Sequence, residues 1–328
     1  MRATFYLPGE DDLDRLRRID PDRDWLEFAR GHRAWILQTY LRLAAAGHDV
    51  DLADEPPRDG MLVFHANQVE SLLRYWWRWG DCLMIAVRAD HSESHLADFE
   101  LVQNRVWVDG SRRFFVPFWP QPGLVPRDPA RGARIERVAF KGFIKSLHPA
   151  FASQAMSDEL RRRGIELMID AVDYRGAETD GSRLRWADYR DVDLVLAVRP
   201  PIGTYTDKPA SKLYNAWRAG VPALLGPEPA FRELYTDPLD YVEVSTVDEV
   251  LAAIDRLRAE PDLYLRMIDR GRQRAVEFSP EAVLERWVDV LWRRIPALAR
   301  ERPWHSFPPW IRPALRRAER LIEGRPSR

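Results

Sequence analysis

The sequence of 328 residues contains a single cysteine, Cys82, which excludes an internal disulfide and a cysteine-based metal cluster. Cys82 lies in the apolar segment DCLMIAV, so we interpret it as a small core residue rather than a nucleophile. A chain with so little cysteine fits a reducing compartment. We therefore expect a cytoplasmic protein.

Long apolar runs and an excess of one charge are also missing. No stretch approaches about 18 consecutive apolar residues, so no membrane span is predicted. The N-terminal segment MRATFYLPGEDD lacks the apolar core of a signal peptide. The 50 basic residues are balanced by 51 acidic ones, whereas nucleic-acid binders usually show a strong basic excess. We expect no nucleic-acid partner.

What the chain does have is a regular alternation of short apolar runs with helical patterns. Apolar runs typical of strands cover 4–7, 50–53, 61–65, 83–88, 137–140, 166–169, 192–198, 222–225 and 241–244. Helical patterns cover 25–46, where Gly47 is placed as a C-cap, and 67–79, 149–163, 210–219, 230–235, 246–259, 261–277 and 280–299. This alternation predicts parallel sheets covered by helices on both faces.

The alternation breaks between 107 and 134, where five prolines argue against a regular element and indicate an interdomain connection. We therefore predict an α/β protein with two Rossmann-like domains facing a central cleft. The N-terminal domain is expected at 1–135 and the second at 136–280. The helices at 281–328 are expected to pack back on the first domain.

The segment 207–226, DKPASKLYNAWRAGVPALLG, places lysines at the start of a helix. A helix N-terminus already has unpaired N–H groups and a partial positive charge, so lysines there are slightly unfavourable. The alternative interpretation is a solvated surface with Pro209 starting the helix. However, the preceding loop follows a buried strand, and ligands of such sheets bind at the carboxyl ends of strands. The pattern therefore predicts an anion-binding site.

The same segment resembles the donor-binding segment of glycosyltransferases with the GT-B fold. Two further stretches are similar to that family: 29–52 to its first helix and second strand, and 138–151 to the first strand and loop of its C-terminal half. Residues 186–200 resemble the segment near its base pocket. Retaining members often have two glutamates separated by seven residues, where this sequence has Asp207 and Asn215. That departure leaves retention or inversion of the sugar linkage open.

A fainter resemblance links the segment to bacterial α-1,3-fucosyltransferases. The matching residues are Lys212, Leu213, Asn215, Ala216, Gly226 and Pro227. Ser211 stands where that family usually has a glutamate. This resemblance points towards GDP-sugars, so the nucleotide expected is GDP or UDP.

The GT-B resemblance implies a set of donor-binding residues at the diphosphate and ribose. They are Lys141, Gly142, Lys145, Arg199, Asp207, Lys208, Ser211, Lys212 and Asn215. A base for the acceptor is expected at strand ends in the N-terminal half, where the candidates are Asp90, His91 and His65. Each of the three could instead be an ordinary cap or loop residue. His32 and Arg33 could contact the donor phosphate or acceptor, or cap a helix, and Glu228 could bind a sugar hydroxyl or favour a helix start.

The implied reaction moves a hexose-type sugar from a nucleoside diphosphate to a hydroxyl of a glycan or lipid-linked acceptor. No cofactor and no metal ion are expected, because enzymes of this fold usually stabilise the leaving group with cations and helix dipoles. The tail from residue 302 mixes aromatic residues with arginine, which indicates either a peripheral membrane contact or a helix packed on the N-terminal half. A sugar-nucleotide epimerase of the same fold and a non-catalytic sugar-nucleotide or glycan-binding protein remain alternatives.

Overall fold

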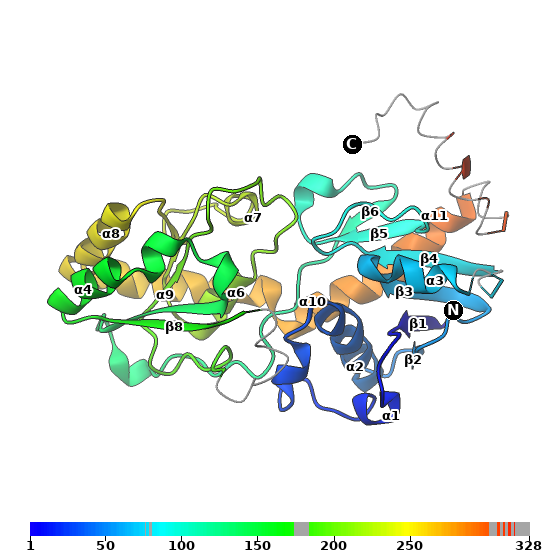
Figure 1. Ribbon diagram of the computed structural model, residues 1–328, viewed down its shortest axis with the longest axis horizontal. Coiled ribbons are helices and arrows are strands. Elements are labelled where there is room, and N and C mark those ends of the chain that lie inside the picture. The colour runs from blue at the N-terminus through cyan, green and yellow to red at the C-terminus, as the bar shows by residue number, and fades with distance from the viewer. Residues whose placement is uncertain are drawn as a thin grey trace. The chain divides into compact units, whose positions relative to one another are not determined.

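The computed structural model describes residues 1–75, 77–78, 81–173 and 184–301, together with 307–308, 311, 314–315 and 318. Contacts group the chain into two units, each with its own sheet (Figure 1). Unit 1 comprises Met1–Phe118, Asp207–Pro209 and Glu281–Arg328, and unit 2 comprises Trp119–Thr206 and Ala210–Pro280. Residue 135, near which the domain boundary was expected, lies inside unit 2.

Unit 1 is built on a six-stranded sheet in the order β2-β1-β3-β4-β5-β6, and every neighbouring pair is parallel. The strands are β1 (Ala3–Tyr6), β2 (Val50–Ala53), β3 (Asp59–His65), β4 (Asp81–Val87), β5 (Phe99–Val102) and β6 (Arg113–Phe115). The middle strands are continuous apolar runs because helices and loops cover both faces of the sheet. Cys82 is buried in this core, as expected.

The helical segments of unit 1 are short. They are α1 (Leu13–Leu16), η1 (Trp25–Phe28), η2 (Arg33–Leu37), α2 (Gln38–Ala45), η3 (Ala66–Gln68), α3 (Val69–Leu73) and η4 (Arg105–Trp107). The expected helix at 25–46 is thus two separate pieces. Gly47 ends α2 with φ +80°, and the N–H of His48 donates to the carbonyl of Leu43 over 3.0 Å, a Schellman-type C-cap.

The C-terminal helical segment packs on unit 1 through aromatic side chains. It consists of α10 (Pro280–Val288), η10 (Asp289–Arg294) and α11 (Ile295–Glu301). Trp287 is fully buried, with its ring centroid 6.2 Å from that of Phe5 and 6.4 Å from that of Trp35. Most of the tail beyond residue 301, for which a membrane contact was considered, lies outside the described residues. No helix in the described part of the chain is long and apolar enough to cross a membrane.

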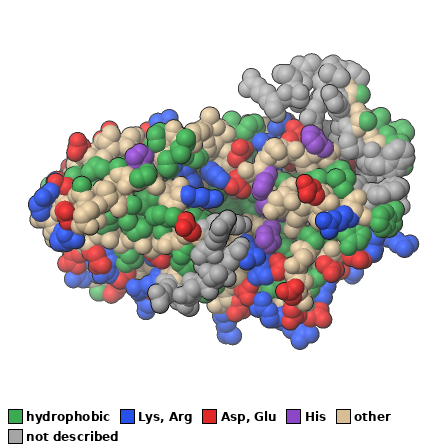
Figure 2. All heavy atoms as spheres, viewed as in Figure 1, with side chains coloured by type: hydrophobic (Ala, Val, Ile, Leu, Met, Phe, Trp, Pro, Cys, Tyr) green, Lys and Arg blue, Asp and Glu red, His purple; other side chains and the backbone are tan. Residues whose placement is uncertain are grey.

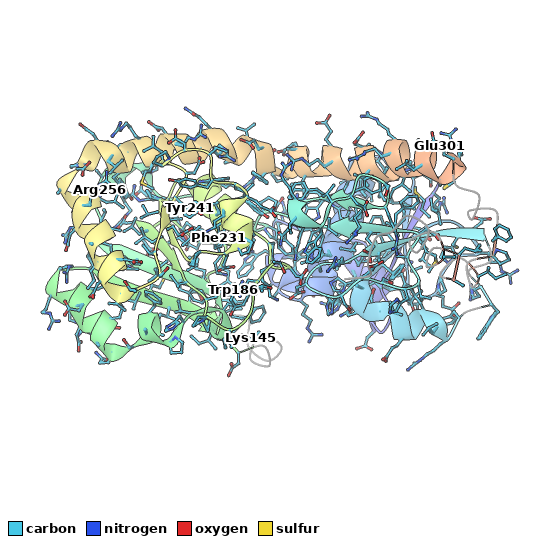
Figure 3. All side chains as sticks on the ribbon, turned by 90° about the horizontal axis from the view of Figure 1, so that it is seen from above. Lys145, Trp186, Phe231, Tyr241, Arg256 and Glu301 are labelled. Atoms are coloured by element: carbon cyan, nitrogen blue, oxygen red, sulfur yellow. The ribbon has the colours of Figure 1, made fainter. Side chains whose placement is uncertain are left out.

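Unit 2 has a five-stranded parallel sheet in the order β11-β10-β9-β7-β8. Its strands are β7 (Arg137–Phe143), β8 (Glu166–Val172), β9 (Leu194–Ala197), β10 (Ala223–Leu225) and β11 (Val242–Glu243). Its helical segments are η5 (Pro129–Arg131), η6 (Ile144–Ser146), η7 (Pro149–Ala152), α4 (Gln154–Arg162), α6 (Ser211–Ala219), α7 (Pro229–Arg232), α8 (Val247–Ala259), α9 (Pro261–Ala275) and η9 (Val276–Phe278). Phe231 and Tyr241 pack against each other in its core, with ring centroids 6.2 Å apart (Figure 3).

The strand order of unit 2 has a direct consequence for ligand binding. The chain runs from β7 to β8 on one side and then returns to place β9 on the other side of β7. The carboxyl ends of β7 and β9 therefore diverge at a topological switch point, where open α/β sheets bind ligands.

The α/β architecture with two Rossmann-like sheets is confirmed, and two strands were missed. The expectation that 107–134 holds no regular element was wrong at β6, which has three residues and forms the edge of the described sheet beside β5. Pro117 closes this short edge strand, and prolines are tolerated beside edge strands because few ladder hydrogen bonds are lost there. The other missed strand is β5, which no helical pattern precedes, so the alternation of strands and helices did not indicate where it begins.

Candidate functional site

Three polar side chains meet at the switch point of unit 2. Ser146 follows β7, Arg199 follows β9 and Glu228 follows β10. The guanidinium of Arg199 donates to Ser146 Oγ over 2.8 Å and to Glu228 Oε2 over 2.9 Å. Because Glu228 is buried and Arg199 is largely so, these bonds fix the orientation of the arginine.

Lys212 lies beside this group, in the first turn of α6. Burial and, to a smaller extent, the neighbouring positive charge of Arg199 lower the pKa of Lys212 to about 8, and Glu228 opposes the shift. Within the part of the chain that the structure describes, its ammonium has no ion pair, and its Nζ lies 5.2 Å from the ring centroid of Phe140. Arg199 is thus paired with Glu228, whereas the nearby Lys212 at the N-terminus of a helix has no anionic partner among the described residues, an arrangement that a bound anion would complete.

Gly142 makes room for the lysine. Its φ is +144°, and a Cβ added there would lie 3.1 Å from Lys212 Nζ. The absent side chain lets the ammonium approach the backbone at the end of β7. The structure therefore brings together three of the expected donor-binding residues: Gly142, Arg199 and Lys212.

We expect Gly142→Ala to weaken nucleotide binding, because the new methyl group displaces the ammonium of Lys212. The strained φ should also lower the free energy of unfolding by about 1–3 kcal/mol. Isothermal titration with UDP and GDP measures the first effect and thermal unfolding the second. Gly164→Ala is the control, since Gly164 has a φ of +69° but nothing within 4 Å of the added Cβ. Equal loss of affinity in both variants would contradict the steric explanation.

Other expected donor residues of unit 2 have different surroundings. Lys141 is buried, and its ammonium contacts Asp170 Oδ2 at 3.3 Å and the carbonyl of Arg185 at 2.7 Å. Lys145 lies in η6 with an exposed side chain (Figure 3). Asn215 accepts a hydrogen bond from the N–H of Gln121 over 2.9 Å, which leaves its amide NH₂ to donate. The ammonium of Lys141 is thus paired with Asp170 on β8, whereas the amide NH₂ of Asn215 can still donate a hydrogen bond.

Ser211 is the first residue of α6, and the preceding N-cap, Ala210, makes no side-chain hydrogen bond. The N-terminal N–H groups of this helix therefore lack the usual capping oxygen. The hydroxyl of Ser211 and these N–H groups form a donor-rich helix start beside Lys212.

Asp207 and Lys208 belong to unit 1, four residues or fewer before Ser211 in the chain. Lys208 forms an ion pair with Asp90, and Asp207 Oδ1 lies 3.4 Å from Arg88 Nη2. Asn104 also donates to the carbonyl of Lys208 over 2.9 Å. The residues expected to form one donor site are thus divided between the two units.

The candidate bases lie at the carboxyl ends of β3 and β4 in unit 1. Figure 2 shows histidine side chains at several places on one face of the molecule. His65 ends β3 and is almost fully buried, and its ring centroid is 5.2 Å from that of His91. Its Nδ1 lies 2.7 Å from Asn67 Oδ1, and its buried Nε2 has no hydrogen-bond partner among the described residues. Burial lowers the pKa of His65 to about 4, so the ring is neutral at pH 7.

Asp90 differs from His65 because it is already paired. Burial raises the pKa of the Asp90 carboxyl, but the hydrogen bond and charge of Lys208 outweigh burial and bring the pKa below its usual value. A paired carboxylate of low pKa is a poor base. Its neighbour Ala89 has a φ of +49°, a conformation that costs an L-residue energy and that clusters at functional sites.

Glu10 was missed by the sequence interpretation, and it explains His32 and Arg33. Its carboxylate forms an ion pair with Arg33, and His32 Nε2 lies 3.5 Å from Glu10 Oε1. Burial raises the pKa of Glu10, but its bonds to these two residues lower it to about 2. Because Glu10 follows β1 closely, its place after a strand was the available signal.

A compositional signal was also overlooked. Four of the 50 basic residues are lysines, namely Lys141, Lys145, Lys208 and Lys212. All four are among the expected donor-binding residues. A chain that otherwise uses arginine throughout thus places its lysines in just two short segments.

Comparison with known proteins bears on both the fold and the chemistry. Residues 157–289 match a family model described as glycosyl transferase-like. This part of the chain is a glycosyltransferase domain. It contains α6 with Lys212, together with Arg199 and Glu228. The glycosyltransferase predicted from the sequence is confirmed at this level.

Solved structures show the fold of the glycosyltransferase more completely. Sucrose-phosphate synthase from Thermosynechococcus elongatus is similar with a TM-score of 0.58 at 12% identity, over 90% of this chain and 99% of its own. HepE from Anabaena, solved with UDP and glucose, gives 0.53 at 11% identity, over 89% and 99%. TarM gives 0.50 at 9% identity over 72% of this chain, which spans 55% of TarM. The GT-B fold is thus confirmed, and no curated protein sequence matches the chain significantly.

Proposed function

We propose that this glycosyltransferase moves a sugar from a nucleoside diphosphate to a hydroxyl of a glycan or lipid-linked acceptor, without a metal ion. The observation that supports this most strongly is the pair of neighbouring cations, Lys212 and Arg199, at a helix N-terminus and a topological switch point. A diphosphate leaving group carries the negative charge that would balance these two cations. Lys212 and the N–H groups of α6 hold the leaving phosphates, and Arg199 orients them.

Ribose recognition falls to Asn215, whose amide NH₂ can donate to a hydroxyl while its oxygen accepts from Gln121. An amide is a weaker partner for a ribose diol than the glutamate usual in this family. UDP is the first nucleotide to test, because HepE was solved with UDP and with UDP-glucose. GDP follows from the fucosyltransferase resemblance.

The acceptor side of the reaction needs a group that takes up a proton. His65 is the best candidate in unit 1, because Asn67 holds Nδ1 and the buried Nε2 has no partner among the described residues. When Nδ1–H donates to Asn67 Oδ1, the neutral ring keeps its lone pair at Nε2, the atom that would take the proton of the acceptor hydroxyl. Its pKa of about 4 makes it a modest base, yet one that is unprotonated at every physiological pH.

We expect His65→Gln to lower kcat by roughly 10²- to 10⁴-fold, the usual loss when general-base catalysis is removed. The KM for the donor should change little, because the donor residues of unit 2 are intact. The matched control is His95→Gln, since His95 is an exposed histidine of the same unit. A large fall in melting temperature with unchanged kcat would instead assign His65 a purely structural role.

A panel of nucleotides and nucleotide sugars tests the function itself. At least one UDP- or GDP-sugar should raise the melting temperature, and its transfer or slow hydrolysis should persist in EDTA. Conversion of that sugar to its epimer without an acceptor would indicate the epimerase instead. Binding without any turnover would indicate a non-catalytic binder. If no nucleotide or nucleotide sugar changes the melting temperature, the proposed function is wrong.

A further inference from the structure

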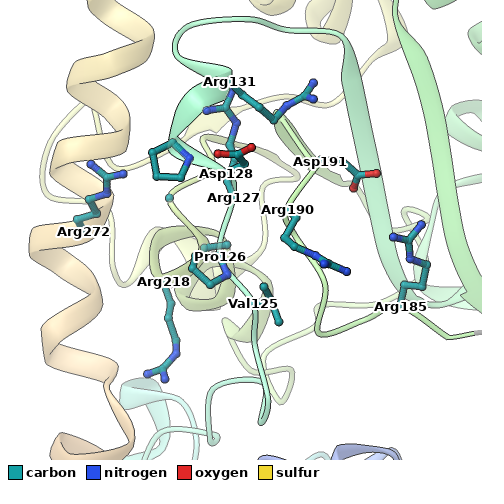
Figure 4. A pocket seen from close by; sticks show the side chains of 13 residues that line it. Val125, Pro126, Arg127, Asp128, Arg131, Arg185, Arg190, Asp191, Arg218 and Arg272 are labelled. Carbon is teal, nitrogen blue, oxygen red and sulfur yellow. The ribbon is translucent and has the colours of Figure 1, made fainter.

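A hollow of about 690 Å³ opens in unit 2 and has no part in the proposed reaction. Figure 4 shows arginine side chains from several elements around it. Its lining consists of Val125, Pro126, Arg127, Asp128, Pro129, Arg131, Arg185, Arg190, Asp191, Arg218, Ala219, Gly220 and Arg272. Six arginines thus face two aspartates, in a volume typical of small-molecule sites.

The hollow lies at the edge of the sheet opposite to the candidate donor site. Arg190 and Asp191 come just before β9, whereas Arg199 follows that strand. Arg218 is in the last turn of α6, whereas Lys212 is in its first turn. The nine residues of α6 span about 13 Å, so one helix separates the hollow from the lysine.

Among the described residues, neither aspartate in the lining forms an ion pair with a lining arginine. Asp191 forms an ion pair with Arg137, which is not part of the lining. The side chain of Asp128 accepts a hydrogen bond from the N–H of Ala130 over 2.9 Å. Asp193, which pairs with Arg127 and Arg131, is fully buried behind the lining.

The arginines themselves are only partly compensated. Arg185 and Arg190 share the single carboxylate of Asp188, at 3.1 and 2.8 Å. Arg272 is mostly exposed and reaches Asp269 only at 3.4 Å. The exposed Arg218 has no ion pair within the described residues.

The arginines of the hollow are not explained by the favourable interaction of a cation with the C-terminus of a helix. Arg272 lies against Gly220, where an added Cβ would be 3.6 Å from its Nε, and so it faces the negative end of α6. One cation is enough to interact with the negative end of α6, and Arg218 in the last turn of that helix already provides it. Arg190 lies on the loop before β9, on the other side of the hollow (Figure 4).

We propose that this arginine hollow is a second binding site, for a compact multivalent anion whose neighbouring phosphate groups bridge Arg218 and Arg272 to Arg190. Guanidinium groups bind phosphate oxygens in a bidentate manner, which suits several arginines around one small polyanion. Among the described residues, none that lines the hollow has an aromatic side chain on which a base could stack. The site therefore recognises a phosphate chain rather than a nucleoside.

Inorganic tripolyphosphate is the probe for this site, measured by calorimetric titration of the full chain. We expect binding to the wild type and a Kd roughly tenfold or more higher in the double variant Arg218→Gln/Arg272→Gln. Lys212→Met should bind tripolyphosphate within about twofold of wild type, because it alters only the opposite edge. Arg256→Gln is the matched control, an exposed arginine on α8 of the same unit (Figure 3).

Several results would overturn the proposal. Absence of tripolyphosphate binding would do so, as would a loss confined to Lys212→Met, which would place the anion at the donor site. An equal loss in Arg256→Gln would indicate unspecific attraction. ATP binding more than tenfold tighter than tripolyphosphate would contradict a site for the phosphate chain alone. Both substituted arginines are exposed, so circular dichroism should show an unchanged fold.

Discussion

Lys212→Met should weaken binding of a nucleoside diphosphate by roughly 10- to 100-fold, the equivalent of losing one charge-assisted hydrogen bond. The variant should fold at least as stably as the wild type. Burial lowers the pKa of Lys212 to about 8, which means that the folded chain disfavours the ammonium. Methionine keeps the length of the side chain and removes that cost.

The same pKa predicts a pH dependence of binding in the wild type. The ammonium form binds phosphate, and in the free protein it is lost as pH rises through about 8. Nucleotide affinity should therefore fall between pH 7 and pH 9, and the fall should be absent in Lys212→Met. Calorimetric titrations at the two pH values measure both effects.

Arg256→Met serves as the control for this substitution, because it removes an exposed cation of unit 2 that is far along the chain from α6. It should leave affinity and its pH dependence unchanged. If Lys212→Met kept wild-type affinity while remaining folded, Lys212 would have no part in donor binding.

Asp193→Asn should have the largest effect on stability, a loss of about 3–5 kcal/mol. The buried carboxylate of Asp193 accepts hydrogen bonds from the side chains of Arg127 and Arg131. It also accepts from the N–H groups of Glu136 and Arg137, over 2.8 and 3.0 Å. An amide cannot balance two guanidinium groups, one of them buried.

The loss corresponds to a fall in melting temperature of roughly 6–20 °C for a unit of this size, measured by thermal unfolding. Burial raises the pKa of Asp193, but its arginine and backbone partners outweigh this and lower it. A carboxyl whose pKa is lower in the folded chain than in the unfolded chain stabilises the fold at any pH above its unfolded pKa. This stabilisation is lost as the pH falls through the folded pKa. The difference between variant and wild type should therefore shrink below about pH 4.

The control for Asp193→Asn is Asp255→Asn, in the same unit. Asp255 pairs with Arg163 at 3.1 Å, but half of its side chain is exposed, so its loss should cost less than about 1 kcal/mol. Similar melting temperatures for the two variants would contradict the structural role assigned to Asp193.

Local sequence signals predicted the elements that hold the site in unit 2. The strand at 222–225 and the helix at 210–219 were placed within a residue or so, because apolar spacing and the Gly-Val-Pro stop are local features. The proximity of Lys212 and Arg199 followed from the rule that carboxyl ends of parallel strands share one edge. Helix boundaries in unit 1 were less accurate, because tight turns and short helical pieces interrupt the 25–46 pattern.

Pairings between distant residues could not be predicted. Lys141 was expected to face phosphate, and it pairs with Asp170 on the neighbouring strand. Asp207 and Lys208 were grouped with Ser211, yet they contact Arg88 and Asp90, more than 100 residues earlier in the chain. Nothing in the spacing of the segment 207–212 reveals these partners.

The sequence by itself thus determined the fold class, the glycosyltransferase resemblance and the helix start that presents Lys212. These depend on local periodicity, turn chemistry and the fixed geometry of parallel sheets. Only the tertiary structure decided which charges remain available. Burial and ion pairing occupy Lys141, Asp90 and Glu10, and they leave Lys212 and the Nε2 of His65 without ion pairs or hydrogen bonds among the described residues. The partners of Lys141, Asp90 and Glu10 are more than 20 residues away in the chain, so local sequence signals could not reveal which charges are paired.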